Sequence, residues 1–276
     1  MTTGDDATDK AKDAARTVRR SPVLRRTARA GFAVLGLLHV VIGATAISVA
    51  VRGGSGGAKA DQTGAMEQIR QSAVGGLVLG AIAVALLALA VWQIADAFLT
   101  RAPKGTTTWG RRLKGLGIAV VYLALATTAL VFAVGGRTDS SRTSQTLSSR
   151  ILSAPGGVFL LVVVGLSVIA IGVGFAFGAV TRSFTRELTL PSGAARIGIL
   201  AFGTVGYAAK GIAVGATGVF VVVAALTHDP QKAAGLDAAL RSLAGLPFGR
   251  ALLYAVGAGL IVYGLFCVVR ARYARM

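Results

Sequence analysis

Four polar residues that interrupt long apolar stretches are the side chains best placed to do chemistry: Lys210, Asp96, Gln93 and His39. Lys210 and Asp96 stand at a similar depth, so they could pair with each other or bind a charged solute, as buried charges in membranes do. His39 could relay protons, since histidine titrates near neutral pH. The structural alternative is that the two charges extend separately to the lipid headgroups. For His39 we expect a neutral side chain that hydrogen-bonds a neighbouring helix.

Around these residues the sequence offers no catalytic or metal-binding constellation. The chain holds two histidines, His39 and His228, and one cysteine, Cys267, so a Cys/His cluster with metal-ligand spacing is excluded. No nucleophile has a visible base partner. Gly172-Val173-Gly174 lies inside an apolar run without a preceding strand, which argues against a phosphate-binding loop. We therefore expect no enzyme activity, no metal and no cofactor.

The composition is that of an integral membrane protein. Of the 276 residues, 54% are apolar and only 14% are charged, against about 25% charged in an ordinary soluble protein. The net charge of +18 comes from 29 basic and 11 acidic residues. This charge does not indicate nucleic-acid binding, because the apolar content is high and no aromatic residues are interleaved with the basic ones for stacking.

Six segments are long enough to cross a bilayer, whose hydrocarbon core takes about 20 helical residues. They cover residues 30–51, 71–95, 115–136, 151–181, 197–227 and 251–269, and Lys210 is the only charged residue within them. Their continuous apolar character favours helices over a barrel of alternating strands. All six prolines fall between these segments or at their starts, where a helix tolerates them. The sequence thus predicts an all-α, polytopic membrane helical bundle.

Basic residues in the connections predict the orientation. The two ends of the chain and the connections on their side hold 19 Lys and Arg, whereas the three opposite connections hold 9. Because basic residues remain on the cytoplasmic side, both termini should be cytoplasmic. We expect a multi-pass protein of the bacterial cytoplasmic membrane.

Residues 1–27 form a polar N-terminal arm that we expect to be partly disordered and cytoplasmic. Arginines gather where the arm reaches the membrane: Arg16, Arg19, Arg20, Arg25, Arg26 and Arg29. Each contributes about 1 kcal/mol near an anionic membrane surface. We therefore expect this arm to contact anionic lipid headgroups, and not nucleic acid.

The chain repeats a two-helix unit three times. Gly31–Gly36 recurs as Gly206–Gly211, and in each copy another glycine follows seven residues later. A weaker copy places Tyr122 at the position of His39 and Val214. Each unit crosses the membrane twice, so every copy enters in the same direction, as parallel repeats do.

The closing halves of the three units align as well. Met66, Leu147 and Leu240 stand nine residues before Gly75, Gly156 and Gly249. The repeats therefore cover residues 28–102, 109–184 and 194–273. We predict six transmembrane helices arranged as three hairpin repeats of parallel topology around a pseudo-three-fold axis.

The third unit carries the clearest resemblance to a known family, in Gly-Tyr-Ala-Ala-Lys-Gly at 206–211 and Leu-Pro-Phe-Gly at 246–249. It resembles the bacterial membrane family called domain of unknown function 1206, which usually has three tandem two-helix units. The first unit departs from that family in Leu35, where a basic residue is usual. The second keeps mainly Tyr122, Pro155 and Gly156. The resemblance implies an inner-membrane protein without an assigned activity.

Glycines four residues apart occur in three spans and allow helices to approach closely. The pairs are Gly76 and Gly80, Gly174 and Gly178, and Gly211 and Gly215. They could form a dimerisation face, giving a homo-oligomer, but we expect them to pack helices within the bundle, which is their commoner use in membrane proteins.

The leading functional hypothesis is a non-enzymatic scaffold or accessory subunit with a membrane-protein partner, because the spans lack a strong polar constellation. The alternative is a transporter or channel for a small solute or ion that uses Lys210 and Asp96, with Gln93 and His39. A transporter needs polar residues along a hydrated path, whereas a scaffold needs a dry, tightly packed interior and an exposed partner face.

Overall fold

The computed structural model describes residues 17, 21–52, 57–99 and 108–275. Six helices in these ranges are long and apolar enough to cross a membrane. They are α2 (Pro22–Val51), α4 (Gly75–Leu99), α5 (Thr108–Ala133), α7 (Gly157–Thr181), α8 (Ala194–Leu226) and α10 (Gly249–Tyr273). The part of the chain that the structure describes contains no β-strand beyond an isolated bridge between Leu188 and Ala274. The predicted all-helical, six-span architecture is confirmed.

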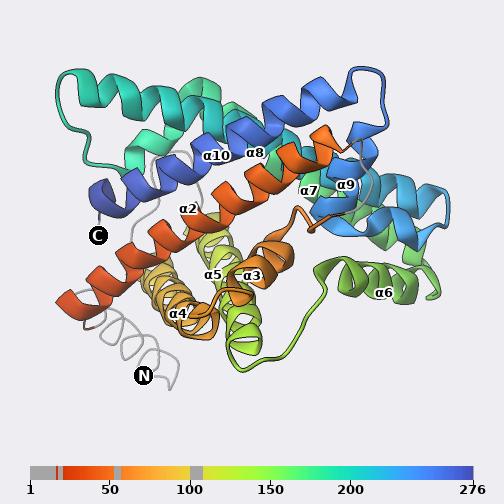
Figure 1. Ribbon diagram of the computed structural model, residues 1–276, viewed down its shortest axis with the longest axis horizontal. Helices are drawn as coiled ribbons and strands as arrows, with labels where there is room; N and C mark the ends of the chain where they lie inside the picture. The colour runs from red at the N-terminus through yellow and green to blue at the C-terminus, as the bar shows by residue number, and fades with distance from the viewer. Residues whose placement is uncertain (1–16, 18–20, 53–56, 100–107, 276) are drawn as a thin grey trace, which may run out of the picture.

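Shorter helices occupy the connections. Inside the three repeats these are α3 (Gln62–Arg70), α6 (Ser140–Leu152), and η2 (Pro230–Ala233) with α9 (Gly235–Ala244). We call the end of the molecule that holds them the loop end. The start of α2 and the end of α10 lie together at the opposite, terminal end (Figure 1). There η1 (Ser183–Glu187) follows α7.

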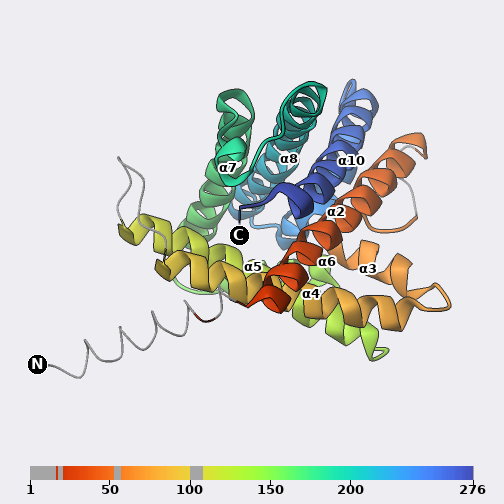
Figure 2. The same ribbon diagram turned by 90° about the vertical axis from the view of Figure 1, so that its left-hand side faces the viewer.

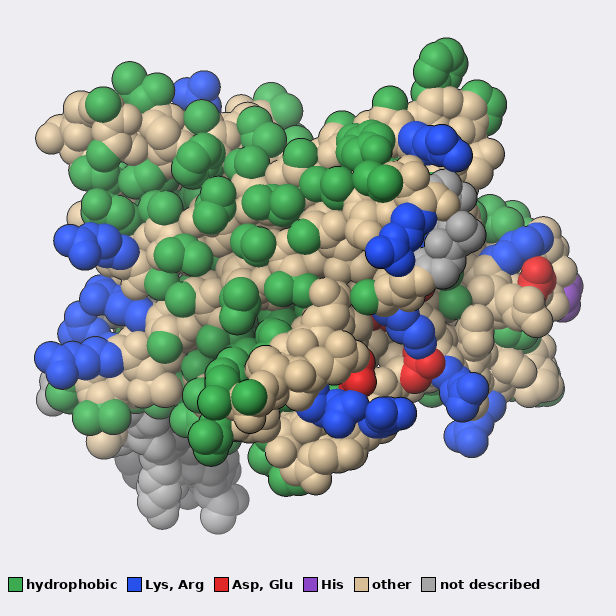
Figure 3. Space-filling model, viewed as in Figure 1, with side chains coloured by type: hydrophobic (Ala, Val, Ile, Leu, Met, Phe, Trp, Pro, Cys, Tyr) green, Lys and Arg blue, Asp and Glu red, His purple; other side chains and the backbone are tan. Residues whose placement is uncertain are grey.

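Figure 3 shows hydrophobic side chains spread over the length of the molecule, with Lys and Arg gathered toward its two ends. Large apolar side chains remain exposed on every long helix, as in Leu77 of α4 at 81% and Val180 of α7 at 82%. In water so much exposed apolar surface would be costly. It is the surface expected of helices that face lipid.

Capping side chains explain where several helices begin. Ser21 caps α2, and Pro22 occupies the first helical position, where its missing N–H costs nothing. Asp61 and Asp139 cap α3 and α6. Each cap accepts a hydrogen bond from the backbone N–H three residues ahead.

One buried carboxylate joins the loops of the first and third repeats. Asp237 of α9 is 7% exposed and accepts a hydrogen bond of 2.8 Å from the backbone N–H of Ala60. The same carboxylate binds Arg241 at 3.0 Å. The guanidinium of Arg241 in turn donates to the Ala58 carbonyl at 3.1 Å.

Replacing Asp237 with alanine should loosen the loop end. The buried N–H of Ala60 would lose its acceptor, which costs about 1–3 kcal/mol. Hydrogen–deuterium exchange of the peptide that contains Ala60 should become at least tenfold faster. Asp237→Asn, which keeps an acceptor oxygen, should change this exchange much less; equal acceleration in both variants would contradict the assignment.

The long helices pack in the order α7, α8, α10, α2, α4, α5. Helices α7, α8, α10 and α2 form one layer. Helices α4 and α5 are seen nearly along their axes in Figure 1 and lengthwise in Figure 2, whereas α2 and α10 run lengthwise in Figure 1. The pair α4 and α5 therefore crosses the layer steeply and is attached to it through α2.

The three main contacts between repeats are equivalent: α2 with α10, α5 with α4, and α8 with α7. Gly36 and Gly43 of α2 face Gly264 and Gly257 of α10, and Gly211 and Gly218 of α8 face Gly172 and Gly165 of α7. The corresponding residues of α5, Ala119 and Ala126, are buried as well. Small residues thus recur at matching positions in all three contacts, as a three-fold repeat predicts.

The structure corrects the alignment of the second repeat by one residue. Helix α7 begins at Gly157, and the same close approach to the carbonyl six residues before is made by Gly75 and Gly249. Gly157, not Gly156, is therefore their counterpart. Ser148 is buried where Met66 and Leu240 are buried, whereas Leu147 is exposed. The sequence alignment was one residue off because the apolar Leu147 resembles Met66 and Leu240 more than the polar Ser148 does.

Candidate functional site

Lys210 lies inside the helix layer and points at side chains of two neighbouring helices. Its Nζ donates a hydrogen bond of 3.0 Å to the hydroxyl of Tyr263 on α10. The ammonium also lies 4.3 Å from the ring centroid of Tyr263 and 4.8 Å from that of Phe175 on α7. A hydrogen bond and two cation–π contacts therefore hold the charge. Lys210 does not extend to the headgroups.

His39 also packs against Tyr263. Its ring stands edge-on to the Tyr263 ring at 4.8 Å between centroids. Its Nδ1 is 2.7 Å from the carbonyl oxygen of Leu35. Because a carbonyl only accepts, Nδ1 carries a proton and donates. The acceptor is in the same helix, so the expected hydrogen bond to a neighbouring helix is replaced by a bond within α2.

Asp96 and Gln93 are not brought to Lys210. Both lie on α4, which packs against α5, α2 and α3, whereas α8 packs against α7 and α10. The polar partner of Lys210 is Tyr263. Gln93 lies near Gly115 of α5. The hypothesis that pairs Asp96 with Lys210 is wrong, because α2 and α10 separate the helices that carry them.

An aromatic cluster continues from Tyr263 toward the terminal end. Tyr207 of α8 and Phe266 of α10 stack around it, and Phe184 of η1 packs on both at 5.1 and 5.2 Å. Beyond the cluster, Arg270 pairs with Glu187. Sequence reasoning missed these residues. Tyr263 is the fifteenth residue of α10, and the fifteenth residues of α4 and α7 are Leu89 and Ile171. A phenol in place of an aliphatic side chain at this position was the sequence signal for the cluster.

The arginines predicted to contact headgroups lie mostly at the terminal end or outside the described residues. Arg16, Arg19 and Arg20 fall outside them. Arg25, Arg26 and Arg29 line one small hollow of about 200 Å³ at the start of α2. Arg29 also donates to the Ala274 carbonyl at 3.5 Å. These three arginines lie together at the terminal end, and their contact with lipid headgroups stays a prediction.

The glycine pairs divide into packed and open positions. Gly211 faces α7, and Gly172 of α7 approaches the backbone of Gly215. A Cβ at Gly76 would lie 3.3 Å from a carbonyl of α5, and one at Gly178 would lie 3.5 Å from Tyr207. At Gly80, Gly174 and Gly215, nothing lies within 4 Å of the position of a Cβ. The spacing of glycines alone does not reveal which of them pack.

The second repeat departs from the other two because its helices, α5 and α7, do not pack along their lengths. In the first repeat a Cβ at Gly31 of α2 would lie 2.9 Å from Leu89 of α4. In the third, one at Gly206 of α8 would lie 2.7 Å from Tyr263 of α10. The glycine allows the second helix to approach in both repeats.

Lys114 is the α5 counterpart of Gly31 and Gly206, since each stands eight residues before the aligned positions His39, Tyr122 and Val214. At this position the second repeat has a long cationic side chain in place of glycine, and its two helices do not pack along their lengths. Ile171 of α7 stands at the position of Leu89 and Tyr263, the residues that face the glycines, and it is 54% exposed. Val121 of α5 is 55% exposed. We call these two exposed faces together the α5–α7 opening.

No group of three or more His, Cys, Asp or Glu in the described ranges could hold a metal ion. The polar features that the described residues do offer are the enclosed ammonium of Lys210, the exposed Lys114 near the start of α5, and the polar connections at the loop end.

Comparison with known proteins agrees with the repeat structure. A match to the family described as Domain of Unknown Function (DUF1206) covers residues 30–100, 114–182 and 205–274, one segment in each repeat. The "Uncharacterized protein YxxB" of Bacillus subtilis (strain 168) is 30% identical over 259 residues, which span 92% of this chain and 93% of that protein. No solved structure gives a significant match.

Proposed function

Because the chain belongs to the DUF1206 family, whose description assigns no activity, we propose a function from the geometry of its second repeat. The protein is a non-enzymatic scaffold or accessory subunit that holds one transmembrane helix of a partner protein in the α5–α7 opening. The observation that carries this proposal is that α5 and α7 do not pack along their lengths, whereas the two helices of each other repeat do.

The first and third repeats indicate the kind of occupant. In each of them, the face corresponding to the opening receives a helix, with glycine against a side chain of the neighbour. Gly117 of α5 and Gly174 of α7 remain without any atom within 4 Å of the position of a Cβ. Small residues on both sides leave room for the close backbone approach by which helices associate in lipid.

Charge complementarity favours a different protein over a second copy of this chain. Lys114 is exposed, and a cation near the start of a span reaches the lipid headgroups or pairs with an anion. A second copy would offer Lys114 again, and its α7 contains no Asp or Glu. The partner helix should therefore carry a carboxylate near the level of Lys114.

Site-specific photocrosslinking in native membranes tests this proposal. A photoreactive residue at Val121 or Ile171 should give one discrete adduct whose crosslinked peptide is an acid-bearing transmembrane segment. The same probe at Leu77, on the exposed face of α4, should give lipid adducts only. Adducts of lipid alone, or of this chain with itself, from Val121 and Ile171 would overturn the proposal.

Reversing the charge of Lys114 should remove the partner. Lys114→Glu is expected to lower the yield of the Val121 adduct at least tenfold, because it places a carboxylate against a carboxylate. Lys114→Arg keeps the charge and should retain the adduct. An unchanged yield in Lys114→Glu would disprove the role of this charge.

Transport of a small solute or ion is the alternative, and the inward direction of Lys210 favours it. The contact of the ammonium with two aromatic rings instead supports a structural role. Proteoliposomes challenged with small neutral and charged osmolytes separate the two hypotheses. Transport requires swelling that is lost in Lys210→Met, whereas a scaffold gives no swelling above that of empty liposomes.

A further inference from the structure

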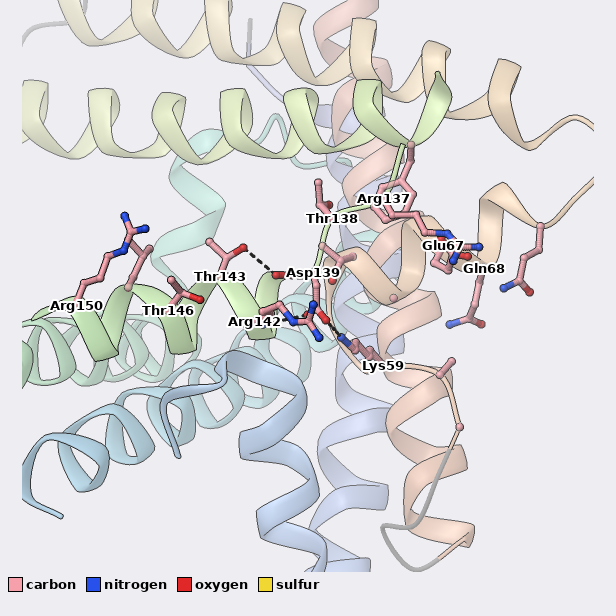
Figure 4. A pocket seen from close by; sticks show the side chains of 17 residues that line it. Lys59, Glu67, Gln68, Arg137, Thr138, Asp139, Arg142, Thr143, Thr146 and Arg150 are labelled. Carbon is pink, nitrogen blue, oxygen red and sulfur yellow. Dashed lines mark hydrogen bonds and ion pairs between the residues drawn. The ribbon is translucent and has the colours of Figure 1, made fainter. Parts of the chain in front are cut away.

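A groove at the loop end brings together the connections of the first two repeats. It has a volume of about 1170 Å³ and lies between the segment leading into α3 and helix α6. Figure 4 shows Arg142 and Arg150 on α6 at one side and Glu67 and Gln68 of α3 at the other, with Arg137 above Glu67. Phe132, at the end of α5, and Leu147 give the groove an apolar part.

The carboxylates of the groove are already engaged. Asp139 pairs with Lys59, and this hydrogen bond lowers the pKa of the Asp139 carboxyl. Glu67 binds Arg70 at 2.7 Å, and that hydrogen bond lowers the pKa of Glu67, with a smaller effect from the charge of Arg137. Both carboxylates are therefore ionised and occupied at neutral pH.

Three arginines of the groove carry a positive charge that no ion pair neutralises. Among the residues that the structure describes, no ion pair joins Arg137, Arg142 or Arg150 to a carboxylate within 4.0 Å. The hydroxyls of Thr138 and Thr146 also line the groove. Guanidinium forks and hydroxyl donors are the groups that recognise the oxygens of a phosphate.

This excess is largest in the second repeat, because at the loop end the third leaves only Arg250 outside the ion pairs of its described residues. In the first, Arg70 pairs with Glu67. In the third, Arg241 and Lys232 pair with Asp237 and Asp229. The second repeat has one acidic residue in its connection, Asp139, and that carboxylate binds Lys59 of the first repeat. The three arginines of the second repeat are therefore left without a carboxylate partner in their own connection.

We propose that this groove binds a phosphate-bearing anion through Arg137, Arg142 and Arg150, with the apolar part of the ligand against Phe132 and Leu147. The ligand is either the headgroup of an anionic lipid or a soluble phosphate ester. The two sources share the phosphate chemistry and differ in whether acyl chains are required.

Calorimetric titration of the full-length protein in neutral detergent tests the proposal with three probes: dihexanoyl phosphatidylglycerol, dihexanoyl phosphatidylcholine and glycerol phosphate. Phosphatidylglycerol should bind at least tenfold more tightly than zwitterionic phosphatidylcholine. Binding of glycerol phosphate as well identifies a soluble ester as a sufficient ligand, whereas its failure to bind identifies a lipid headgroup. Equal affinity for phosphatidylcholine, or no binding of either anion, would overturn the proposal.

The variant R137Q/R142Q/R150Q should weaken binding of phosphatidylglycerol at least tenfold. Its matched control is R196Q/K232Q/R250Q, which removes the same charge at exposed positions outside the groove and should change the affinity less than twofold. Equal weakening in the two variants would mean that net charge alone attracts the anion. Single variants of Arg142 and Arg150 serve if the triple variant elutes as an aggregate, and each should weaken binding severalfold.

Discussion

Replacing Gly36 with leucine should strongly destabilise the helix bundle, by forcing α2 away from α10. A Cβ at Gly36 would lie 2.5 Å from the carbonyl oxygen of Gly264, and 3.0 Å from a methyl of Val268. The obstruction is backbone, so α2 and α10 must separate. Overpacking of this kind costs about 3 kcal/mol, which corresponds to a fall in Tm of about 6–12 °C for a chain of this size.

Thermal unfolding in mild detergent measures this effect, and the open glycines supply its controls. Gly80→Leu and Gly174→Leu place the same side chain where nothing lies within 4 Å. They should change stability by less than about 0.5 kcal/mol, as exposed substitutions do. A fall in Tm with Gly80→Leu equal to that of Gly36→Leu would show that any leucine at a glycine disrupts the fold, irrespective of the contact with α10.

Removing the hydroxyl of Tyr263 should have the second-largest effect. In Tyr263→Phe the ammonium of Lys210 loses the hydrogen bond of 3.0 Å that holds it inside the helix layer. Loss of a hydrogen bond to a charged group costs about 1.5–3 kcal/mol. Replacing both members, Lys210→Met with Tyr263→Phe, removes the charge together with its partner, and apolar replacement of a whole buried polar pair is often nearly neutral.

The two variants and their combination form a double-mutant cycle. Tyr263→Phe should cost little once Lys210 is methionine, so the unfolding free energies should depart from additivity by at least about 1 kcal/mol. Thermal or denaturant unfolding in detergent supplies these values. Additive effects would mean that the hydrogen bond is unimportant to stability. A large cost for Lys210→Met alone would assign the charge a further role.

Hydropathy and spacing were enough to predict much of the fold. The six helices follow from uninterrupted apolar runs, and the end of α2 at Val51 coincides with the expected end of the first span. The repeat was visible because Gly31, Gly36 and Gly43 recur at the same spacing as Gly206, Gly211 and Gly218, and these glycines pack against neighbouring helices. The match to three successive DUF1206 segments agrees with that repeat.

The candidate sites were much less predictable. The sequence marks Lys210 as unusual. Asp96 was its predicted partner because it lies at a similar depth, but two residues at equal depth need not lie on neighbouring helices. The aligned repeat did contain a signal that its second copy differs, since Lys114 stands where Gly31 and Gly206 stand. Its meaning depended on the observation that Leu89 and Tyr263 occupy the space beside those glycines.

The sequence by itself determined which segments can cross a membrane and that a two-helix unit occurs three times. These properties are local, because about 20 apolar residues satisfy the bilayer whatever their neighbours are. Only the tertiary structure decided which helices meet, that Tyr263 holds Lys210, and that one repeat stays open. Those outcomes depend on contacts between residues distant in the sequence, because the presence or absence of one Cβ, or of one partner for a charge, decides whether two helices can pack.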